Sequence, residues 1–348
     1  MTPPALPPKP PMVANLAVGL SAVIVSSGEA LLTDQAAPRV LIVRAPGSGR
    51  EALPAGPLEP HHRSLATGLR AWVERRSAQR LGYVEQLYTF SNRDRTETDG
   101  PGAENALSVC YLALTRDPLT PEDPLLPAET THWHSWYDYL PWEDWRDGRP
   151  ALLDRIEDRL ELWAAAAGYA PASRIRRERL HLAFGTGGTG WNEERALERY
   201  ELLYEAGLVE EARRDHAAEG AVTDPNTGLE DRNIPSHIPG RSLALDHRRM
   251  LATALARLRG KIKYRPVVFE LMPPAFTLLH LQRTVEALAG LRLHKQNFRR
   301  LVEQQGLVEE TGASTAGTGG RPARLVRFRP EVLLERPAPG LRAGRPRS

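Results

Sequence analysis

The chain has 348 residues, enough for two or three domains, and 41% of them are hydrophobic, an ordinary fraction for a soluble globular protein. No apolar run approaches the roughly 20 residues needed to cross a bilayer, and the opening MTPPALPPKPPM lacks the apolar core of a signal peptide. Cys110 is the only cysteine, which excludes an internal disulfide and predicts a cytoplasmic location.

Charge is distributed unevenly, although the whole chain carries a formal net charge of only +3. Residues 257–348 hold 18 Lys and Arg against 7 Glu and no Asp, a net charge of +11, so the preceding 256 residues carry −8. A basic terminal module on an acidic body favours a polyanionic partner. The alternative is a solvated basic tail, and that is our interpretation of the last residues, LRAGRPRS.

A first domain is expected over residues 14–145, after a Pro-rich N-terminus, 1–13, that is predicted to be disordered. The β-branched runs LAVGLSAVIV and RVLIVRA predict strands. A helix is predicted to begin at Ser64, because an apolar stripe follows it, formed by Leu65, Leu69, Trp72 and Val73. Two more strands are expected over 83–90 and 106–114. This order predicts a mixed α/β domain.

A helical insertion is expected over residues 146–240, with helices over 151–167, 173–184 and 192–220. Before the last helix, the stretch FGTGGTGW is interpreted as a flexible hinge, with phosphate binding by its backbone amides as the alternative. The aromatic run WHSWYDYLPWEDW is interpreted as core or interface packing, with base stacking as the alternative. His132 and His134 lack a Cys or acidic partner at useful spacing, so no metal site is expected.

A linker helix over 241–260, with apolar Leu251, Leu255 and Leu258, leads into a basic module over 261–332. In this module Thr277 predicts the N-cap of a helix and Gly290 predicts its end. The apolar face of that helix is formed by Leu278, Leu281, Val285 and Leu288.

A second helix is predicted to begin near His294. It places Phe298, Leu301 and Val302 on one side and turns Gln296, Arg299 and Arg300 outward. Two short strands joined by a Gly-rich loop follow, and residues 333–348 are predicted to be a disordered basic tail. This is the pattern of a winged helix-turn-helix, whose second helix fits a DNA major groove.

The first domain resembles a Nudix hydrolase domain, because the segment LPAGPLEP precedes its helix and SWYDYLP looks like a late Nudix strand. Alignment on Gly56 matches the Nudix box at Gly56, Arg70, Trp72 and Glu74, while three acidic positions are His62, Ala71 and Arg75. One remaining carboxylate is a poor site for Mg²⁺, so no catalytic residue and no metal site are expected. The substitutions leave an electropositive groove that attracts a diphosphate. The alternative is a purely structural pair of Arg70 and Glu74 on the helix.

The chain as a whole resembles the NrtR type of Nudix-related transcriptional regulators of NAD metabolism. The resemblance is carried by the Nudix-like body, the helix that starts Leu-Asp-His, the connector KIKYRP and the segment GRPARLVRFR. The resemblance covers residues 15–145 and 241–330, and the helical insertion is more like the longer NadQ type. It implies a fold class of α+β multidomain, a Nudix-like α/β/α domain with a helical insertion and a C-terminal winged helix-turn-helix.

The resemblance also implies a homodimeric repressor of NAD biosynthesis genes that binds double-stranded operator DNA, requires no cofactor and does not interact with membranes. Its effector is expected to be a nucleotide such as ADP-ribose, NAD or ATP, whose binding changes the angle between the two winged helices. The implied DNA-binding residues are Lys295, Gln296, Asn297, Arg299, Arg300, Arg321 and Arg324. The expected effector-binding residues are Arg44, His62, Arg70 and Glu74.

Two other functions are weighed against this one. The first is an active Nudix pyrophosphatase for ADP-ribose or a related nucleotide with an accessory DNA-binding domain, which requires Glu85 or Glu104 to rebuild the metal site. The second is a nucleotide-binding scaffold whose winged helix binds protein.

Overall fold

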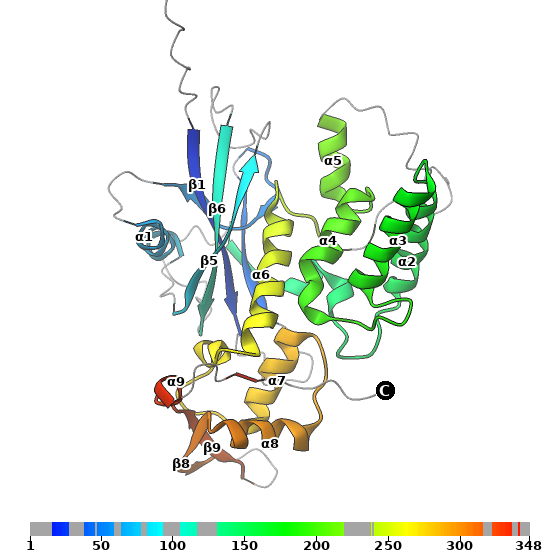
Figure 1. Ribbon diagram of the computed structural model, residues 1–348. Helices are drawn as coiled ribbons and strands as arrows, with labels where there is room; N and C mark the ends of the chain where they lie inside the picture. The colour runs from blue at the N-terminus through cyan, green and yellow to red at the C-terminus, as the bar shows by residue number, and fades with distance from the viewer. Residues whose placement is uncertain are drawn as a thin grey trace, which may run out of the picture.

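A computed structural model describes residues 16–27, 38–45, 47–58, 64–77, 82–92, 105–116, 131–218, 238, 240–315, 322–335 and 340–341. Figure 1 shows a twisted sheet, a group of helices beside it and a small winged helix beneath both, with one helix, α6, running between the sheet and the helical group. No helix in these ranges is long and apolar enough to cross a membrane.

Within the described residues the sheet has seven strands: β1 (Leu16–Ser26), β2 (Arg39–Arg44), β3 (Glu51–Ala52), β4 (Ala55–Pro57), β5 (Val84–Asn92), β6 (Asn105–Thr115) and β7 (Thr131–Ser135). Its order is β3-β2-β1-β6-β5, while β4 also pairs with β1 and β7 pairs with β2. Strands β1 and β6 run parallel along their whole length, and the other described pairs are antiparallel. The expected strands over 83–90 and 106–114 are therefore confirmed.

Different helices cover the two faces of the sheet. Each strand contributes to both faces, because its successive side chains point to opposite sides. Leu20, Ala22 and Ile24 of β1 pack on the side of helix α1 (Leu65–Ser77). The intervening Val23 and Val25 belong to the core that contains α6. Helix α1 begins one residue after its predicted start at Ser64, and Ser64 caps it, since its Oγ accepts a hydrogen bond from the Thr67 amide at 3.1 Å. The predicted α/β/α layering is confirmed.

The inserted helices are α2 (Leu152–Ala165), α3 (Ala170–Phe184), α4 (Ala196–Glu205) and α5 (Glu210–Ala218), with 3-10 turns η2 (Trp136–Asp138), η3 (Pro141–Glu143) and η4 (Glu193–Arg195). The prediction of a single helix over 192–220 is wrong. The helix breaks at Gly207, which adopts a φ of 70° that residues with a side chain avoid. The amide of Leu208 then closes the end of α4 by donating to the Leu203 carbonyl.

The glycine-rich and aromatic segments both serve packing. At the end of α3, Gly185 lies so close to Trp191 that an added Cβ would be 2.4 Å from the Trp191 nitrogen. The loop is fastened by His181, whose Nδ1 lies 2.7 Å from Thr186 Oγ1, so it is a hydrogen-bonded turn. The hinge interpretation stays a prediction. Trp136 and Trp142 are 1% and 0% exposed. Core packing, the favoured interpretation of the aromatic run, is therefore confirmed for these two tryptophans.

Helix α6 (His247–Ile262) occupies the segment expected to be a linker, but it is a central element of the core. Leu251, Leu255 and Leu258 are fully buried, and α6 packs against the sheet on one side and against α4 on the other. After the 3-10 turn η6 (Val267–Leu271) the chain enters the winged helix.

The winged helix comprises α7 (Leu278–Ala289), α8 (Lys295–Gln305), β8 (Val308–Ser314), β9 (Arg324–Phe328) and the short α9 (Val332–Glu335). Thr277 caps α7 by accepting from the His280 amide at 3.1 Å, and Gly290 ends it with a φ of 72°, both as predicted. Leu341 is buried and its amide donates to the Ile262 carbonyl at 2.8 Å. The prediction of disorder over 333–348 is therefore wrong for α9 and for Leu341. The apolar side chain of Leu341 is buried near the end of α6.

Candidate nucleic-acid interface

The second helix of the winged helix, α8, presents a polar surface. It starts after His294 and ends at Gly306, which has a φ of 59°. Phe298 and Val302 form the buried face of this helix. This spacing leaves the remaining faces to solvent, and all five predicted helix contacts are exposed: Lys295, Gln296, Asn297, Arg299 and Arg300.

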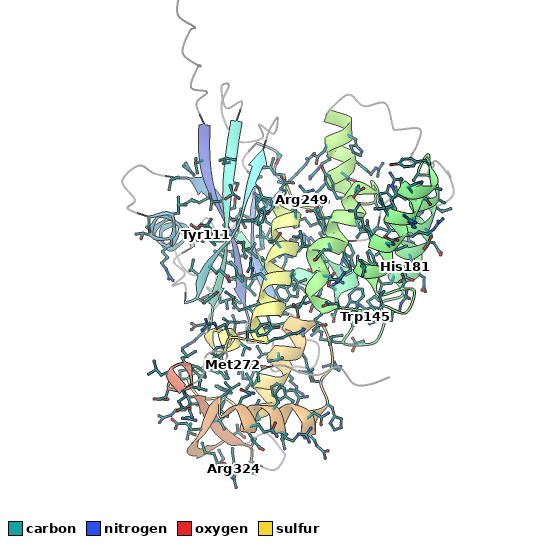
Figure 2. The ribbon with its side chains drawn as sticks, viewed as in Figure 1. Tyr111, Trp145, His181, Arg249, Met272 and Arg324 are labelled. Atoms are coloured by element: carbon teal, nitrogen blue, oxygen red, sulfur yellow. The ribbon has the colours of Figure 1, made fainter. Side chains whose placement is uncertain are left out.

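The cations of α8 differ from those of the wing, which is the β8–β9 hairpin. Among the described residues, Lys295, Arg299 and Arg300 form no ion pair. In the wing, Arg324 donates to Glu310 at 2.5 Å and Arg327 to Glu309 at 2.6 Å. Arg324 lies at the outer end of the winged helix (Figure 2). An exposed pair of this kind contributes only about 0–1 kcal/mol, so a phosphate can displace the carboxylate. Arg321 lies outside the described residues.

A buried carboxylate fixes the turn between α7 and α8. Glu286 is 5% exposed, and its Oε1 accepts from the Leu293 amide at 2.9 Å and from Gln282 Nε2 at 2.8 Å. Its other oxygen accepts from Arg292 at 3.3 Å, and Gln282 also donates to the Leu293 carbonyl. These bonds set the angle at which α8 leaves the turn. Sequence reasoning missed them because most of the bonds join the α7 side chains to Arg292 and Leu293 in the turn, beyond the end of the helix.

A second buried carboxylate ties the winged helix to the body. Glu143 in η3 accepts from Arg199 Nε at 2.6 Å and from Arg259 Nη1 at 2.5 Å, and all three side chains are fully buried. Burial opposes ionisation of Glu143, but the charges of Arg199 and Arg259 outweigh it and lower its pKa. Arg259 also donates to the Leu288 carbonyl of α7 at 3.1 Å.

Neighbouring contacts strengthen this junction. Tyr137 donates from its hydroxyl to the Ala287 carbonyl at 2.7 Å, and the Trp145 amide donates to the Gly290 carbonyl at 2.8 Å. The Glu143 network, defined as Glu143, Arg199 and Arg259, therefore connects the inserted helix α4, the core helix α6 and the winged helix.

The predicted effector-binding residues do not form one cluster. Arg70 lies on α1, where it donates to the Gly82 carbonyl at 3.0 Å. Arg44 lies at the end of β2. It is on the same face of this strand as Val40 and Ile42, and that face packs on α6, on the opposite side of the sheet from α1. His62 lies outside the described residues, as does the side chain of Glu74. The structure therefore separates Arg44 from the Nudix-like helix.

Glu85 is also unsuited to the metal-binding role weighed for it. Its Oε2 lies 2.6 Å from Lys261 Nζ and accepts from the Tyr83 hydroxyl at 2.8 Å. No group of three His, Cys, Asp or Glu side chains gathers as a metal site within the described ranges. Glu104 lies outside them.

A winged helix with a basic, exposed second helix, joined to a mixed α/β body, defines the class as a winged-helix protein. Residues 268–328 match the family described as NrtR DNA-binding winged helix domain, and this part of the chain is a domain of that family. The predicted resemblance to the NrtR type is confirmed there.

The chain is also similar to individual proteins. The chain is 46% identical over 86 residues to the "ADPR responsive transcriptional repressor NtrR" of Acinetobacter baylyi, a match that covers 25% of this chain and 34% of that protein. The match thus spans about a third of the curated relative. Shewanella oneidensis NrtR complexed with a 27mer DNA is similar at 20% identity, over 94% of this chain and 99% of that one, with a TM-score of 0.49. The NUDIX domain of the same protein complexed with ADP ribose is similar at 23% identity, over 38% and 81%, with a TM-score of 0.27.

Proposed function

We propose that this protein is a transcriptional repressor of NAD biosynthesis genes that binds operator DNA as a homodimer and responds to a nucleotide. The nucleotide we propose is ADP-ribose. The observation that carries the proposal is the set of exposed cations on α8 that form no ion pair with any described residue, within the segment that matches an NrtR DNA-binding domain. The relative from Acinetobacter baylyi, described as an ADPR-responsive repressor, supports the choice of ligand.

Each part of the winged helix has a role in the proposal. The side chains of Gln296, Asn297 and Arg300 point from α8 toward base edges in the major groove, while Lys295 and Arg299 add phosphate contacts. Arg324 exchanges Glu310 for a phosphate, and Arg321 contributes to the same wing. Two copies of α8 in a dimer fit the two half-sites of a palindromic operator.

In this proposal the Nudix-like domain binds the nucleotide without hydrolysing it. Three box positions that need carboxylates hold His62, Ala71 and Arg75, and Glu85 is neutralised by Lys261. Incubation with ADP-ribose and Mg²⁺ or Mn²⁺ should release no AMP. Turnover that Glu74→Gln abolishes would instead establish the pyrophosphatase.

The DNA-binding half is tested by fluorescence anisotropy with labelled promoter fragments of NAD biosynthesis genes. Replacing Arg300 by Ala should weaken specific binding by about 1–3 kcal/mol, which is roughly 5- to 150-fold. Arg174→Ala is the matched control, because Arg174 is a 76% exposed arginine on α3, in the helical insertion. Binding to none of the fragments at moderate salt, with or without nucleotide, would refute the proposal. Equal affinities of the Arg300→Ala and Arg174→Ala variants would refute the role of α8.

A further inference from the structure

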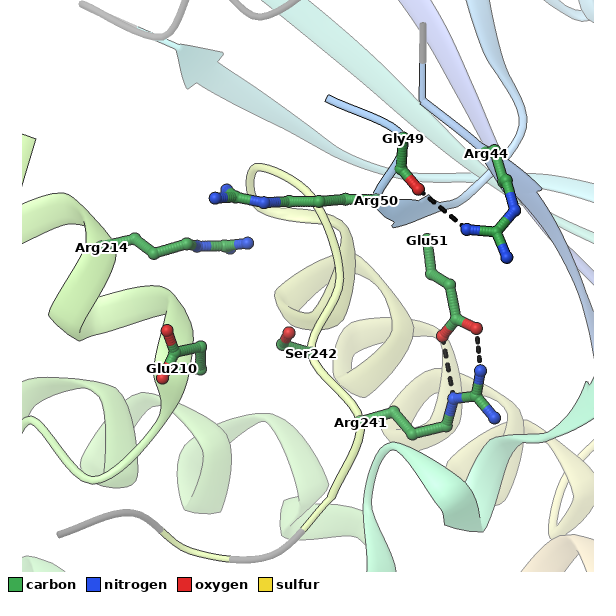
Figure 3. A pocket seen from close by; sticks show the side chains of 8 residues that line it. All are labelled: Arg44, Gly49, Arg50, Glu51, Glu210, Arg214, Arg241 and Ser242. Carbon is green, nitrogen blue, oxygen red and sulfur yellow. Dashed lines mark hydrogen bonds and ion pairs between the residues drawn. The ribbon is translucent and has the colours of Figure 1, made fainter. Parts of the chain in front are cut away.

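A cavity of about 350 Å³ lies between the β2–β3 hairpin, helix α5 and the segment that leads into α6. Figure 3 shows its lining, which includes four arginines and two glutamates: Arg44, Arg50, Arg214, Arg241, Glu51 and Glu210. The hairpin supplies Arg44 and Arg50, and the helical insertion supplies Arg214. This volume falls within the range of about 300–1,000 Å³ typical of small-molecule sites.

The arginines are held in place by the protein around them. Arg44 donates to the Gly49 carbonyl at 3.0 Å, and Arg214 donates to the Leu243 carbonyl at 2.7 Å. Arg241 forms a two-pronged pair with Glu51, whose Oε2 also accepts from the Tyr139 hydroxyl at 2.9 Å. A guanidinium has five N–H donors, so these bonds orient each group and leave donors for a ligand.

The charge of the cavity favours a dianion. Among the described lining residues, four arginines against two glutamates give a formal net charge of +2, and Glu51 is already engaged by Arg241. In Figure 3, Arg50 and Arg214 extend toward one another from opposite walls. An anion placed among several guanidinium groups gains charge-assisted hydrogen bonds from each of them. Arginine forks match phosphate oxygens in geometry as well as charge.

We propose that this arginine pocket binds the diphosphate of the effector nucleotide, so that the site lies between the sheet and the helical insertion and not against the Nudix-like helix α1. This inference rests on the proposed function for the identity of the ligand. It uses Arg44 but not Arg70, which lies on the other side of the sheet, and it gives the insertion a role, since Arg214 belongs to α5.

The pocket is placed to act on the DNA-binding domain through α6. The segment 241–245 is bonded on one side to the hairpin, by the Ala244 amide and the Glu51 carbonyl at 2.8 Å. On the other side the Leu243 amide donates to Glu211 of α5 at 2.9 Å. Leu245 adopts a φ of 50°, a left-handed backbone conformation that is strained for a residue with a side chain. A ligand that draws hairpin and α5 together therefore acts on the start of α6, and the far end of α6 carries Arg259 to the winged helix.

Calorimetry on the full chain tests the pocket with two probes, ADP-ribose and inorganic pyrophosphate. Arg44→Ala and Arg214→Ala should each weaken ADP-ribose binding by about tenfold or more, the loss of one charge-assisted contact. Arg70→Ala, on α1, and Arg177→Ala, an exposed arginine of α3, should leave the affinity within about twofold. Arg214→Lys keeps the charge and should lose less than Arg214→Ala, which separates ligand contact from damage to the fold.

The outcomes distinguish this inference from the proposed function. Loss of ADP-ribose binding in Arg70→Ala, with Arg44→Ala and Arg214→Ala unchanged, would overturn the pocket and leave a nucleotide-responsive repressor intact. Failure of the wild-type protein to bind either probe would also overturn it. Pyrophosphate binding that depends on Arg214, in a protein whose DNA affinity is unchanged by ADP-ribose, would support the pocket and refute the proposed effector.

Discussion

The Glu143 network provides the sharpest test of how the winged helix is joined to the body. Glu143→Gln keeps the shape of the side chain but removes the negative charge between two buried guanidinium groups. Breaking a buried ion pair by changing one partner costs about 3–5 kcal/mol. We expect a loss of this size in the free energy of unfolding, because neither Arg199 nor Arg259 is able to reach solvent without opening the core.

The assay is urea unfolding followed by tryptophan fluorescence, since Trp142 and Trp191 lie close to the network. Glu161→Gln is the control: its partner is Arg177 at 3.1 Å, and both side chains are more than 40% exposed. The control should cost less than about 1 kcal/mol. A Glu143→Gln loss as small as that of the control would show that the buried charges contribute no more than a surface pair.

The network also predicts a pH dependence. Because the pKa of Glu143 lies below its ordinary value of 4.5 in the folded protein, its contribution is present above pH 4.5 and is lost as the pH falls through the lowered pKa. Wild-type protein should lose more stability than Glu143→Gln on acidification below that pH. Parallel losses in the two proteins would contradict this assignment.

Two further predictions concern the same junction and the start of α6. Gly290→Ala should lower the free energy of unfolding by about 3 kcal/mol or more, because an added Cβ meets the Glu143 carbonyl oxygen at 2.3 Å in addition to the left-handed backbone. Gly148→Ala, with a φ of 99° and nothing within 4 Å, should show only the backbone cost of about 1–2 kcal/mol, and equal losses in the two variants would exclude the clash. Burial lowers the pKa of His247 from 6.5 to about 4, and its Nδ1 accepts from the Leu53 amide at 3.0 Å. The linked stability, about 3 kcal/mol, is fully present above pH 6.5 and is lost as the pH falls toward 4. Urea unfolding across this range should show a steeper decline in wild type than in His247→Gln, and identical slopes would rule out His247 as the group responsible.

The winged helix was predictable from the sequence because its determinants are local. Thr277 and Gly290 define the ends of α7 through contacts within a few residues. Phe298 and Val302, four residues apart, fix which face of α8 is buried and so which side chains are exposed. The excess of basic residues after Arg257 required only counting.

Tertiary structure alone decided how the domains are joined and where an anion fits. Glu143, Arg199 and Arg259 lie far apart in the chain, and no spacing rule brings them together. Arg44 and Arg214 meet at one cavity because the insertion folds back beside the β2–β3 hairpin. The expected linker helix became a core helix for the same reason: its three leucines mark an apolar face, but the elements that cover the rest of α6 come from distant parts of the chain. A local pattern specifies which residues share a face, whereas long-range packing decides what that face meets.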